Sequence, residues 1–175
     1  IQFLQTMKGL FFVTFSSLLL YLLSKQFFIN LQKEKDKLAN ANNILENIIE
    51  NAPIIIFWKD ENGIFRGSNK RFLELMDLKN EKELIGKKDS DFNIVENKDF
   101  MSDDVYVMTN KKPKLNYTET ITTKNKSVKI LNTSKVPLFD EKKNVIGVLG
   151  VIQDITEQTN NQTLLKEHEQ LLIQQ

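Results

Sequence analysis

The feature that most constrains the fold is a charge-free apolar run near the start of the chain. Residues 9–24 read GLFFVTFSSLLLYLLS, and widening the stretch to residues 1–31 adds only two charges, Lys8 and Lys25. A transmembrane helix needs about 20 apolar residues, and lysines near its ends can reach the headgroups. A helix that is apolar on all faces rarely fits a small soluble domain. We therefore expect a transmembrane helix over residues 1–30.

Two alternatives compete for this run, a buried helix of a soluble protein and a signal peptide. No small-residue cleavage site follows, because the chain continues as SKQFFIN, which favours a retained helix. Four lysines follow the run closely (residues 25, 33, 35 and 37), whereas only Lys8 precedes it. The positive-inside rule then predicts a single span in the inner, or cytoplasmic, membrane with everything downstream in the cytoplasm. Because the chain begins with Ile1, we expect a fragment of a longer protein.

Residues 31–50 are predicted to form a connecting helix. Leu31, Leu38 and Leu45 recur every seven residues, with Ala41 and Ile48 at the intervening positions. This heptad pattern favours a parallel coiled coil with a second copy, and hence a homodimer, but it is shorter than the three or four heptads that secure such an assignment. A solvated linker helix is the alternative.

From residue 51 the pattern changes to short strands and helices. The stretches PIIIFWKD and IFRGSN, separated by ENG, predict a hairpin, and KRFLELMDL predicts a helix. Residues 99–112 predict a longer helix with Phe100, Val105 and Met108 facing inward. Three further strands are expected over residues 114–123, 127–139 and 144–155. This order predicts an α+β domain: a five-stranded antiparallel sheet with helices on one face.

Three segments in this order resemble the PAS domain family of sensory modules. They are FWKDENGIFRGSNKRFLEL (57–75), ELIGKKDSDF (83–92) and GVLGVIQDITEQ (147–158), the last carrying an Asp-Ile-Thr-Glu signature at residues 154–157. The resemblance implies a PAS domain over residues 51–158. Residues 159–175 would then begin an output helix.

The Asp-Ile-Thr-Glu segment also has a physical explanation. Asp154 and Thr156 have short polar side chains that can bond backbone groups where a strand ends and a helix begins. Glu157 would lie near the helix N-terminus, where negative charge is favoured. A plain helix cap is one interpretation. The resemblance implies another, a hinge through which these three residues relay movements of the sheet to the output helix.

The residues that are missing exclude several cofactors. The chain has no cysteine, and Lys70 stands where light-sensing members carry the flavin-bonding cysteine of a motif resembling N-C-R-F-L. The only histidine, His168, lies beyond the domain, which argues against the axial ligand usual for haem, with Met101 or Met108 as poor substitutes. We expect no haem, no cysteine-linked flavin and no metal. A non-covalently bound small molecule is compatible with the sequence.

A pocket between sheet and helices is the remaining sensory option. Aromatic and aliphatic walls with a few polar groups suit such a pocket. The alternative is that most of these side chains simply fill the core. The candidate lining residues are Phe57, Trp58, Asn69, Phe72, Tyr106, Tyr117 and Leu131.

The chain offers no candidate catalytic residues. No carboxylate pair, phosphate-binding loop or nucleophile motif occurs, and the sequence after His168 departs from that of a phosphorylated histidine box. The charges of the 24 basic and 23 acidic residues nearly cancel, and the sequence has no long basic stripe that would bind nucleic acid. We expect a non-enzymatic cytoplasmic PAS domain that relays a signal from a membrane protein to a C-terminal effector, a histidine kinase or a diguanylate cyclase. The alternative is a ligand-free PAS domain that serves only for dimerisation and relay.

Overall fold

The computed structural model describes residues 2–92, 100–123 and 126–173. The chain divides into two compact units, residues 1–48 and residues 49–175. From Gln2 onward the first unit is part of α1 (Gln2–Asn51), a continuous helix of 50 residues. This helix is long and apolar enough to cross a membrane. It includes both the expected spanning segment and the expected connecting segment, without a break between them.

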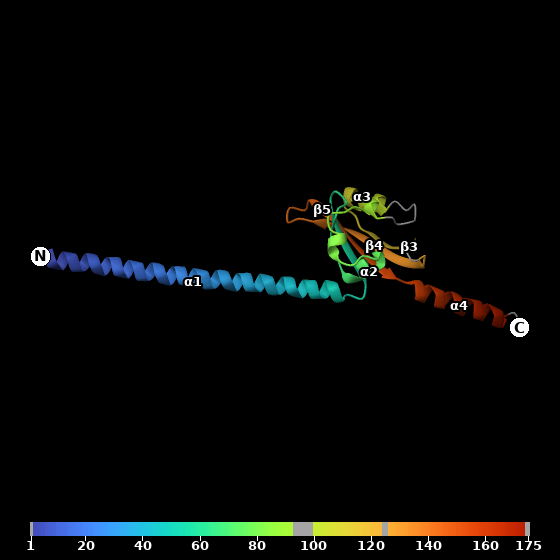
Figure 1. The fold of residues 1–175 in the computed structure, drawn as a ribbon, viewed down its shortest axis with the longest axis horizontal. Coiled ribbons are helices and arrows are strands. Elements are labelled where there is room, and N and C mark those ends of the chain that lie inside the picture. Colours follow the sequence, from blue (N-terminus) through green and yellow to red (C-terminus); the bar gives the residue numbers. More distant parts are fainter. Residues whose placement is uncertain (1, 93–99, 124–125, 174–175) are drawn as a thin grey trace. The chain divides into compact units, whose positions relative to one another are not determined.

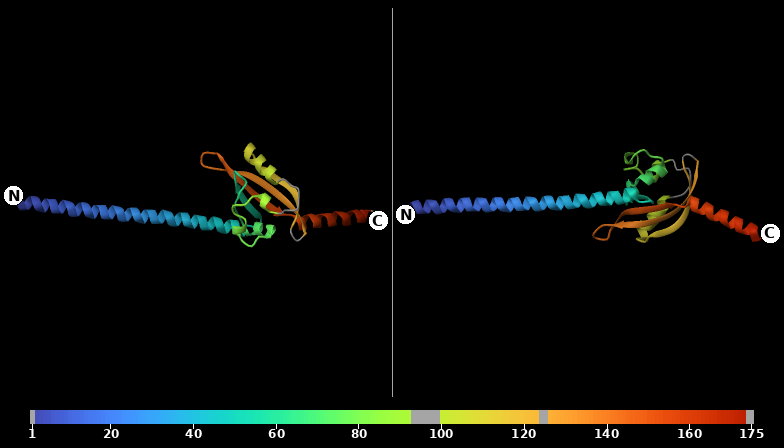
Figure 2. Two further views of the ribbon diagram at one scale, coloured as in Figure 1. Left: turned by 45° about the horizontal axis from the view of Figure 1, so that its top comes forward. Right: turned by 90° about the horizontal axis from the view of Figure 1, so that it is seen from below.

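The second unit is built on a five-stranded antiparallel sheet with the strand order β2-β1-β5-β4-β3 (Figure 1). The predicted α+β class and sheet are confirmed. The tip of the long β4–β5 hairpin, in orange, extends past the other strands of the sheet in Figure 2. The strands are β1 (Ile55–Asp60), β2 (Phe65–Ser68), β3 (Lys114–Thr122), β4 (Val128–Phe139) and β5 (Val145–Asp154).

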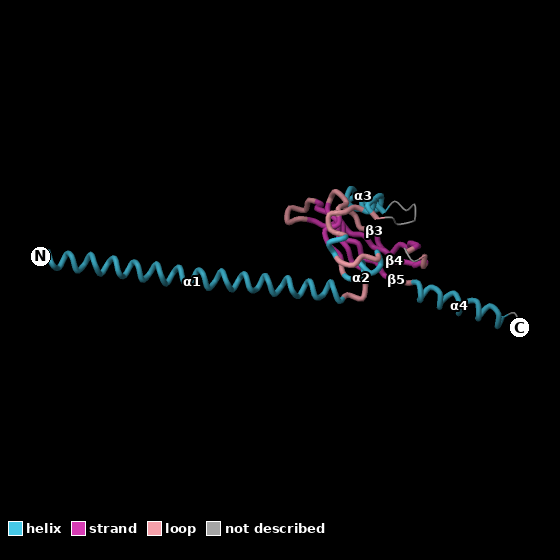
Figure 3. The backbone as a smooth tube through the Cα atoms, in the orientation of Figure 1, coloured by secondary structure: helices cyan, strands magenta, loops and turns pink. Residues whose placement is uncertain are grey.

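Helices occupy the segment between β2 and β3 and the end of the chain (Figure 3). Helix α2 packs against β1, and α3 packs against β4 and β5. Two 3₁₀ turns lie between α2 and α3, and α4 follows β5 directly. Their bounds are α2 (Lys70–Met76), η1 (Glu81–Glu83), η2 (Asp89–Asp91), α3 (Phe100–Asn110) and α4 (Thr156–Ile173).

One of the residues of helix α3 that were predicted to face inward is exposed instead. Val105 is 50% exposed, so its predicted inward placement is wrong. The buried residues of α3 are Asp104 and Val107, which are three apart and therefore share one face of the helix. The prediction failed because an aspartate was not expected inside, and Asp104 proves to be held there by two lysines.

The buried face of the sheet follows the two-residue period of β-strands. In β1, Ile55, Phe57 and Lys59 are buried, while the residues between them are partly exposed. In β4, Leu131, Thr133 and Lys135 alternate in the same way. The core therefore lies between this face of the sheet and the segment that carries α2, η1, η2 and α3.

The β1–β2 turn is fixed by its own sequence. Asp60 Oδ1 accepts hydrogen bonds from the backbone N–H groups of Asn62 (2.9 Å) and Ile64 (3.0 Å). Gly63 takes a positive φ of 73°, which a residue without Cβ adopts at little cost. Burial alone would raise the pKa of Asp60, but the hydrogen bonds from Ile64 and Arg66 outweigh it and hold that pKa below its ordinary value.

Candidate functional site: an internal cavity and a strand-to-helix junction

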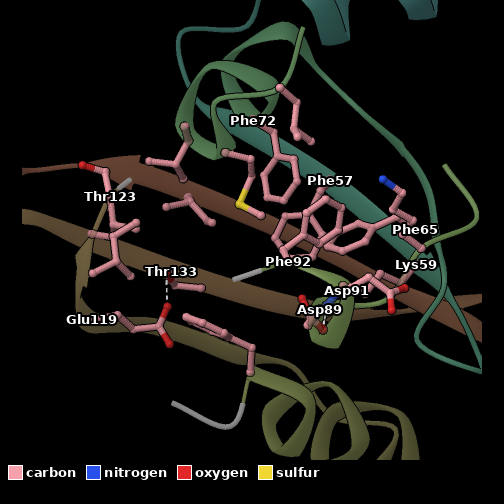
Figure 4. Close-up of a pocket in the computed structure, with 18 of the residues that line it drawn as sticks. Phe57, Lys59, Phe65, Phe72, Asp89, Asp91, Phe92, Glu119, Thr123 and Thr133 are labelled. Atoms are coloured by element: carbon pink, nitrogen blue, oxygen red, sulfur yellow. Dashed lines mark hydrogen bonds and ion pairs between the residues drawn. The ribbon is translucent and has the colours of Figure 1, made fainter. Parts of the chain in front are cut away.

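A cavity of about 350 Å³ lies between the buried face of the sheet and the helical segment (Figure 4). This volume is within the range of small-molecule sites, roughly 300–1,000 Å³. Its apolar lining comes from strands on one side and from α2 and the loops on the other. The main apolar residues are Phe57, Phe65, Phe72, Leu75, Met76, Phe92, Phe100, Ile121, Leu131 and Ile152.

Four phenylalanines form one wall of the cavity. The Phe57 and Phe72 ring centroids are 4.8 Å apart, and Phe65 lies 5.5 Å from Phe72 and 5.9 Å from Phe92. Gly150 in β5 lies against Phe57, and a Cβ at that position would overlap the Phe57 ring. The wall therefore depends on a glycine in the neighbouring strand as well as on the rings themselves.

A buried charge network lies beside this aromatic wall. The Lys59 ammonium is 2.5 Å from Asp89 Oδ2 and 2.7 Å from Asp104 Oδ2, and the Lys59 side chain is 1% exposed. Lys135 Nζ is 2.6 Å from Asp104 Oδ1 and donates to the Phe100 carbonyl at 2.9 Å. Each lysine thus has at least one carboxylate, as buried charges require. The network joins β1 and β4 to α3 and η2.

A separate acidic group lies in β3. Glu119 is 8% exposed and lines the cavity. One of its carboxylate oxygens accepts a hydrogen bond from the Thr133 hydroxyl at 2.8 Å, which is drawn as a dashed line in Figure 4. In that view Glu119 and Thr133 lie at the other end of the cavity from Asp89. The cavity thus has apolar walls between two polar regions.

Three of the seven predicted lining residues do line the cavity: Phe57, Phe72 and Leu131. The described lining does not include the other four. Trp58 follows Phe57 in β1, so it points to the opposite face of the sheet, where its ring lies against Gly67. Tyr106 is 51% exposed on α3. The strand and helix periods explain both placements.

Asn69 is buried for a structural reason. Its Oδ1 accepts from the Phe72 N–H at the start of α2 (3.2 Å) and from the Ile56 N–H (3.0 Å). Its Nδ2 donates to the carbonyls of Ile54 (2.7 Å) and Ile49 (3.2 Å). Asn69 therefore caps α2 and fixes the chain that enters β1, and these four bonds use the side chain fully.

Tyr117 lies on β3, with the Lys114 ammonium 4.1 Å from its ring centre. Burial raises the pKa of Tyr117, and the negative charges of Glu119 and Asp103 raise it further. The hydroxyl therefore stays neutral at every physiological pH.

The polar residues of the cavity are not among the predicted lining residues. Lys59 comes two residues after Phe57, and Thr133 and Lys135 come two and four residues after Leu131. Since strand side chains alternate between faces, each of these residues shares the buried face with a predicted lining residue, Phe57 or Leu131. The signal was present, but a lysine between hydrophobic residues is normally assigned to the solvent side.

The junction between β5 and α4 is held by the predicted relay residues. Asp154 Oδ1 accepts from the Thr156 N–H at 3.0 Å, and Asp154 Oδ2 is 2.8 Å from the Lys129 ammonium. The Thr156 hydroxyl in turn accepts from the Ile130 N–H at 2.9 Å. Glu157 lies exposed in the first turn of α4, where negative charge is favoured.

The electrostatics of Asp154 agree with this geometry. Burial alone would raise its pKa, but the hydrogen bonds from Lys129 and Thr156 outweigh it and hold the pKa below its ordinary value. The carboxylate is therefore charged at neutral pH. Among the described residues, no three histidine, cysteine, aspartate or glutamate side chains gather as a metal-binding group.

The domain thus combines a five-stranded antiparallel sheet, helices that flank an internal cavity, and a last strand that leads into an exposed helix. Residues 49–160 match the PAS fold family, and the chain belongs to that family. The resemblance inferred from the three sequence segments is confirmed.

Several solved structures share the fold. A Vibrio cholerae VqmA dimer without target DNA is 21% identical, with a TM-score of 0.59 over 64% of this chain and 50% of that chain. The PAS domain of a Colwellia psychrerythraea protein is 18% identical (TM-score 0.55, covering 67% of this chain and 98% of that chain). The PAS domain of Bordetella pertussis BvgS is 15% identical (TM-score 0.51, covering 74% and 98%).

These likenesses concern the fold alone. The chain spans about half the length of the VqmA structure. A search of curated proteins found no match.

Proposed function

We propose that this PAS domain detects a small molecule in its internal cavity and relays occupancy through the β5–α4 junction to a C-terminal effector. The effector would be a histidine kinase or a diguanylate cyclase, and α1 would anchor the protein in the inner membrane with the PAS domain in the cytoplasm. The excess of lysines after the apolar run supports that orientation.

One observation carries the proposal: three consecutive residues of β4 connect the cavity to the junction. The Leu131 side chain lines the cavity and is 2% exposed. Ile130 is bonded to the junction through its N–H, which donates to Thr156 Oγ1, and its carbonyl, which accepts from the Ile155 N–H at 2.9 Å. Lys129 holds Asp154. A displacement of Leu131 by a ligand would therefore shift the backbone that holds the first turn of α4.

A parallel homodimer is part of the proposal. Leu31, Leu38 and Leu45 are each more than half exposed along α1, as are Leu164 and Leu171 along α4. Pairing of such stripes with a second copy would bury them and bring two output helices side by side. Light scattering on the chain without residues 1–30 tests this pairing. A strict monomer at high micromolar concentration would contradict it.

The relay is tested by fusing the chain, through α4, to a histidine kinase catalytic domain and measuring autophosphorylation. Asp154→Ala removes the acceptor of the Thr156 N–H, and loss of such a cap costs about 0.5–2 kcal/mol. That is small against a whole domain's stability of about 5–15 kcal/mol, so the protein should stay folded. We expect basal output to change by at least about twofold, the ratio equivalent to about 0.5 kcal/mol.

Asp140→Ala is the matched control. Asp140 accepts from the Asn144 N–H (2.8 Å) and side-chain amide (2.9 Å) in the β4–β5 turn, at the other end of the same two strands. This variant loses comparable hydrogen bonds without touching α4, and its output should equal that of the parent. If Asp154→Ala remains folded and its output is also unchanged, the junction is only a helix cap.

A further inference from the structure

Glu119 is a buried carboxylate whose hydrogen-bonding capacity is largely unused. A carboxylate has about four acceptor positions, and among the described residues Glu119 has one hydrogen-bond donor, the Thr133 hydroxyl. Its side chain is nevertheless more than nine-tenths buried, at 8% exposure. Something that donates to Glu119 would therefore be stabilised in the cavity.

The two buried lysines of the cavity are already engaged and cannot neutralise Glu119. Lys59 is bonded to Asp89 and Asp104, and Lys135 is bonded to Asp104 and to the Phe100 carbonyl. The third lining lysine, Lys87, is exposed and lies over the Phe92 ring. Figure 4 shows Lys59 at the end of the cavity away from Glu119.

The total charge around the cavity is negative. Four carboxylates line it, on Glu83, Asp89, Asp91 and Glu119, against the three lysines, and Asp104 adds a fifth carboxylate behind the lining. Such a surrounding favours a cation over an anion. The apolar residues between Glu119 and the aromatic wall call for a hydrocarbon or aromatic body on the same molecule.

We propose that the cavity binds a small protonated amine with a compact apolar body. The ammonium donates to the free acceptor positions of Glu119, with Thr133 orienting the carboxylate, and the body lies against Leu131, Ile152 and the phenylalanine wall. This proposal rests on the proposed sensory function and names the ligand class. A carboxylate-bearing ligand is disfavoured, because it would meet Glu119 while both buried ammonium groups are occupied.

The test uses 2-phenylethylamine as the probe, with 2-phenylethanol and 3-phenylpropanoate as neutral and anionic probes of similar shape. Binding to the full chain in lipid nanodiscs is measured by calorimetry at neutral pH, with empty nanodiscs subtracted. We expect the amine to bind at least about tenfold more tightly than the alcohol, as for a hydrogen bond to a charged group. The acid should bind more weakly than either.

Glu119→Gln is the decisive variant, because glutamine keeps the shape and an acceptor for Thr133 while removing the charge. It should bring the amine's affinity down to that of the alcohol and leave the alcohol's affinity unchanged. Glu141→Gln, an exposed residue of the β4–β5 turn, is the control and should preserve the preference. If Glu119→Gln does not fold, Thr133→Val replaces it, because valine removes the hydroxyl that orients Glu119. Thr133→Val should lower the affinity for the amine more than the affinity for the alcohol.

The possible failures separate this inference from the proposed function. Equal affinity for amine and alcohol in the parent chain, or a preference that survives Glu119→Gln, overturns the ligand class but leaves a ligand-binding cavity. Binding of none of the three probes also overturns it. The relay through Asp154 is measured on basal output without any probe, so its result is independent.

Discussion

At the scale of single residues, the domain depends on a few buried polar groups with specific partners. Asp104 is 1% exposed on α3 and holds two lysines from different strands. Removing one partner of a buried ion pair leaves the other charge buried and uncompensated. Removing one partner of a surface pair leaves the other charge in contact with water, which costs little. Two adjacent aspartates in α3 allow these cases to be compared in one helix.

Asp104→Ala should lower the free energy of unfolding by about 3–5 kcal/mol, because among the described residues Lys135 then keeps only the Phe100 carbonyl as a partner. Asp103→Ala should lower it by about 1 kcal/mol or less, because Asp103 and its partner Lys114 are 20% and 37% exposed. Urea unfolding of the full chain, followed by fluorescence of the single tryptophan, Trp58, measures both.

A similar small loss in the two variants would show that the buried network adds little stability.

The contribution of Asp103 to stability should also depend on pH. Burial alone would raise its pKa, but Lys114 and Tyr117 outweigh burial and lower it. Its stabilising contribution is therefore present above the ordinary value of 3.8 and is lost as the pH falls through the lowered pKa.

How far the sequence predicts the site can be judged residue by residue. Phe57, Phe72 and Leu131 were predicted as lining residues because large apolar side chains in strands and amphipathic helices face the core. Glu119 and Lys59 were not, because their burial depends on partners that lie 14 and 45 residues away, Thr133 and Asp104. Such pairings follow from strand register and helix position, which a single sequence does not specify.

At the scale of elements, β4 is coupled to the start of α4 by backbone and side-chain hydrogen bonds. The order and approximate bounds of the strands follow from their turns: Gly63 and the Asp140–Asn144 segment each mark a hairpin end. Helix α3 was predicted at the right place, and of its predicted inward residues Phe100 lines the cavity whereas Val105 is exposed. The junction residues were identified from both capping chemistry and family resemblance.

The junction should depend on pH in a defined direction. Because Asp154 has a lowered pKa in the folded state, its contribution is fully present above the ordinary value of 3.8 and is lost as the pH falls through the lowered pKa. The melting temperature of the parent should exceed that of Asp154→Asn by a few degrees at pH 7, equivalent to about 0.5–1 kcal/mol for a partly exposed ion pair. The difference should shrink as the pH falls below 3.8 and disappear once Asp154 is protonated in the folded protein.

Trp58 fluorescence during thermal unfolding gives both melting temperatures across the pH range. Glu141→Gln, which alters an exposed carboxylate far from α4, should melt like the parent throughout. A difference between the parent and Asp154→Asn that persists unchanged once Asp154 is protonated would mean that the Asp154 charge does not stabilise the junction.

At the scale of the whole molecule, the chain combines a long exposed helix with a PAS domain. The apolar part of α1 is almost entirely uncovered: Phe11, Phe12 and Leu20 are each at least 67% exposed. Water would oppose so much uncovered apolar surface, and a bilayer would remove that cost. By length and composition, α1 is able to cross a membrane.

The absence of cysteine makes orientation directly measurable, because one introduced cysteine is then the only thiol. A membrane-impermeant maleimide should label Gln5→Cys in intact spheroplasts and Gln162→Cys only in inverted vesicles. The physical reason is the excess of lysines after the span. Replacing Lys33, Lys35 and Lys37 together with asparagine should therefore produce a mixed population in which Gln162→Cys is also labelled in spheroplasts. Labelling of Gln162→Cys in intact spheroplasts with all lysines present would place the PAS domain outside and overturn the cytoplasmic relay.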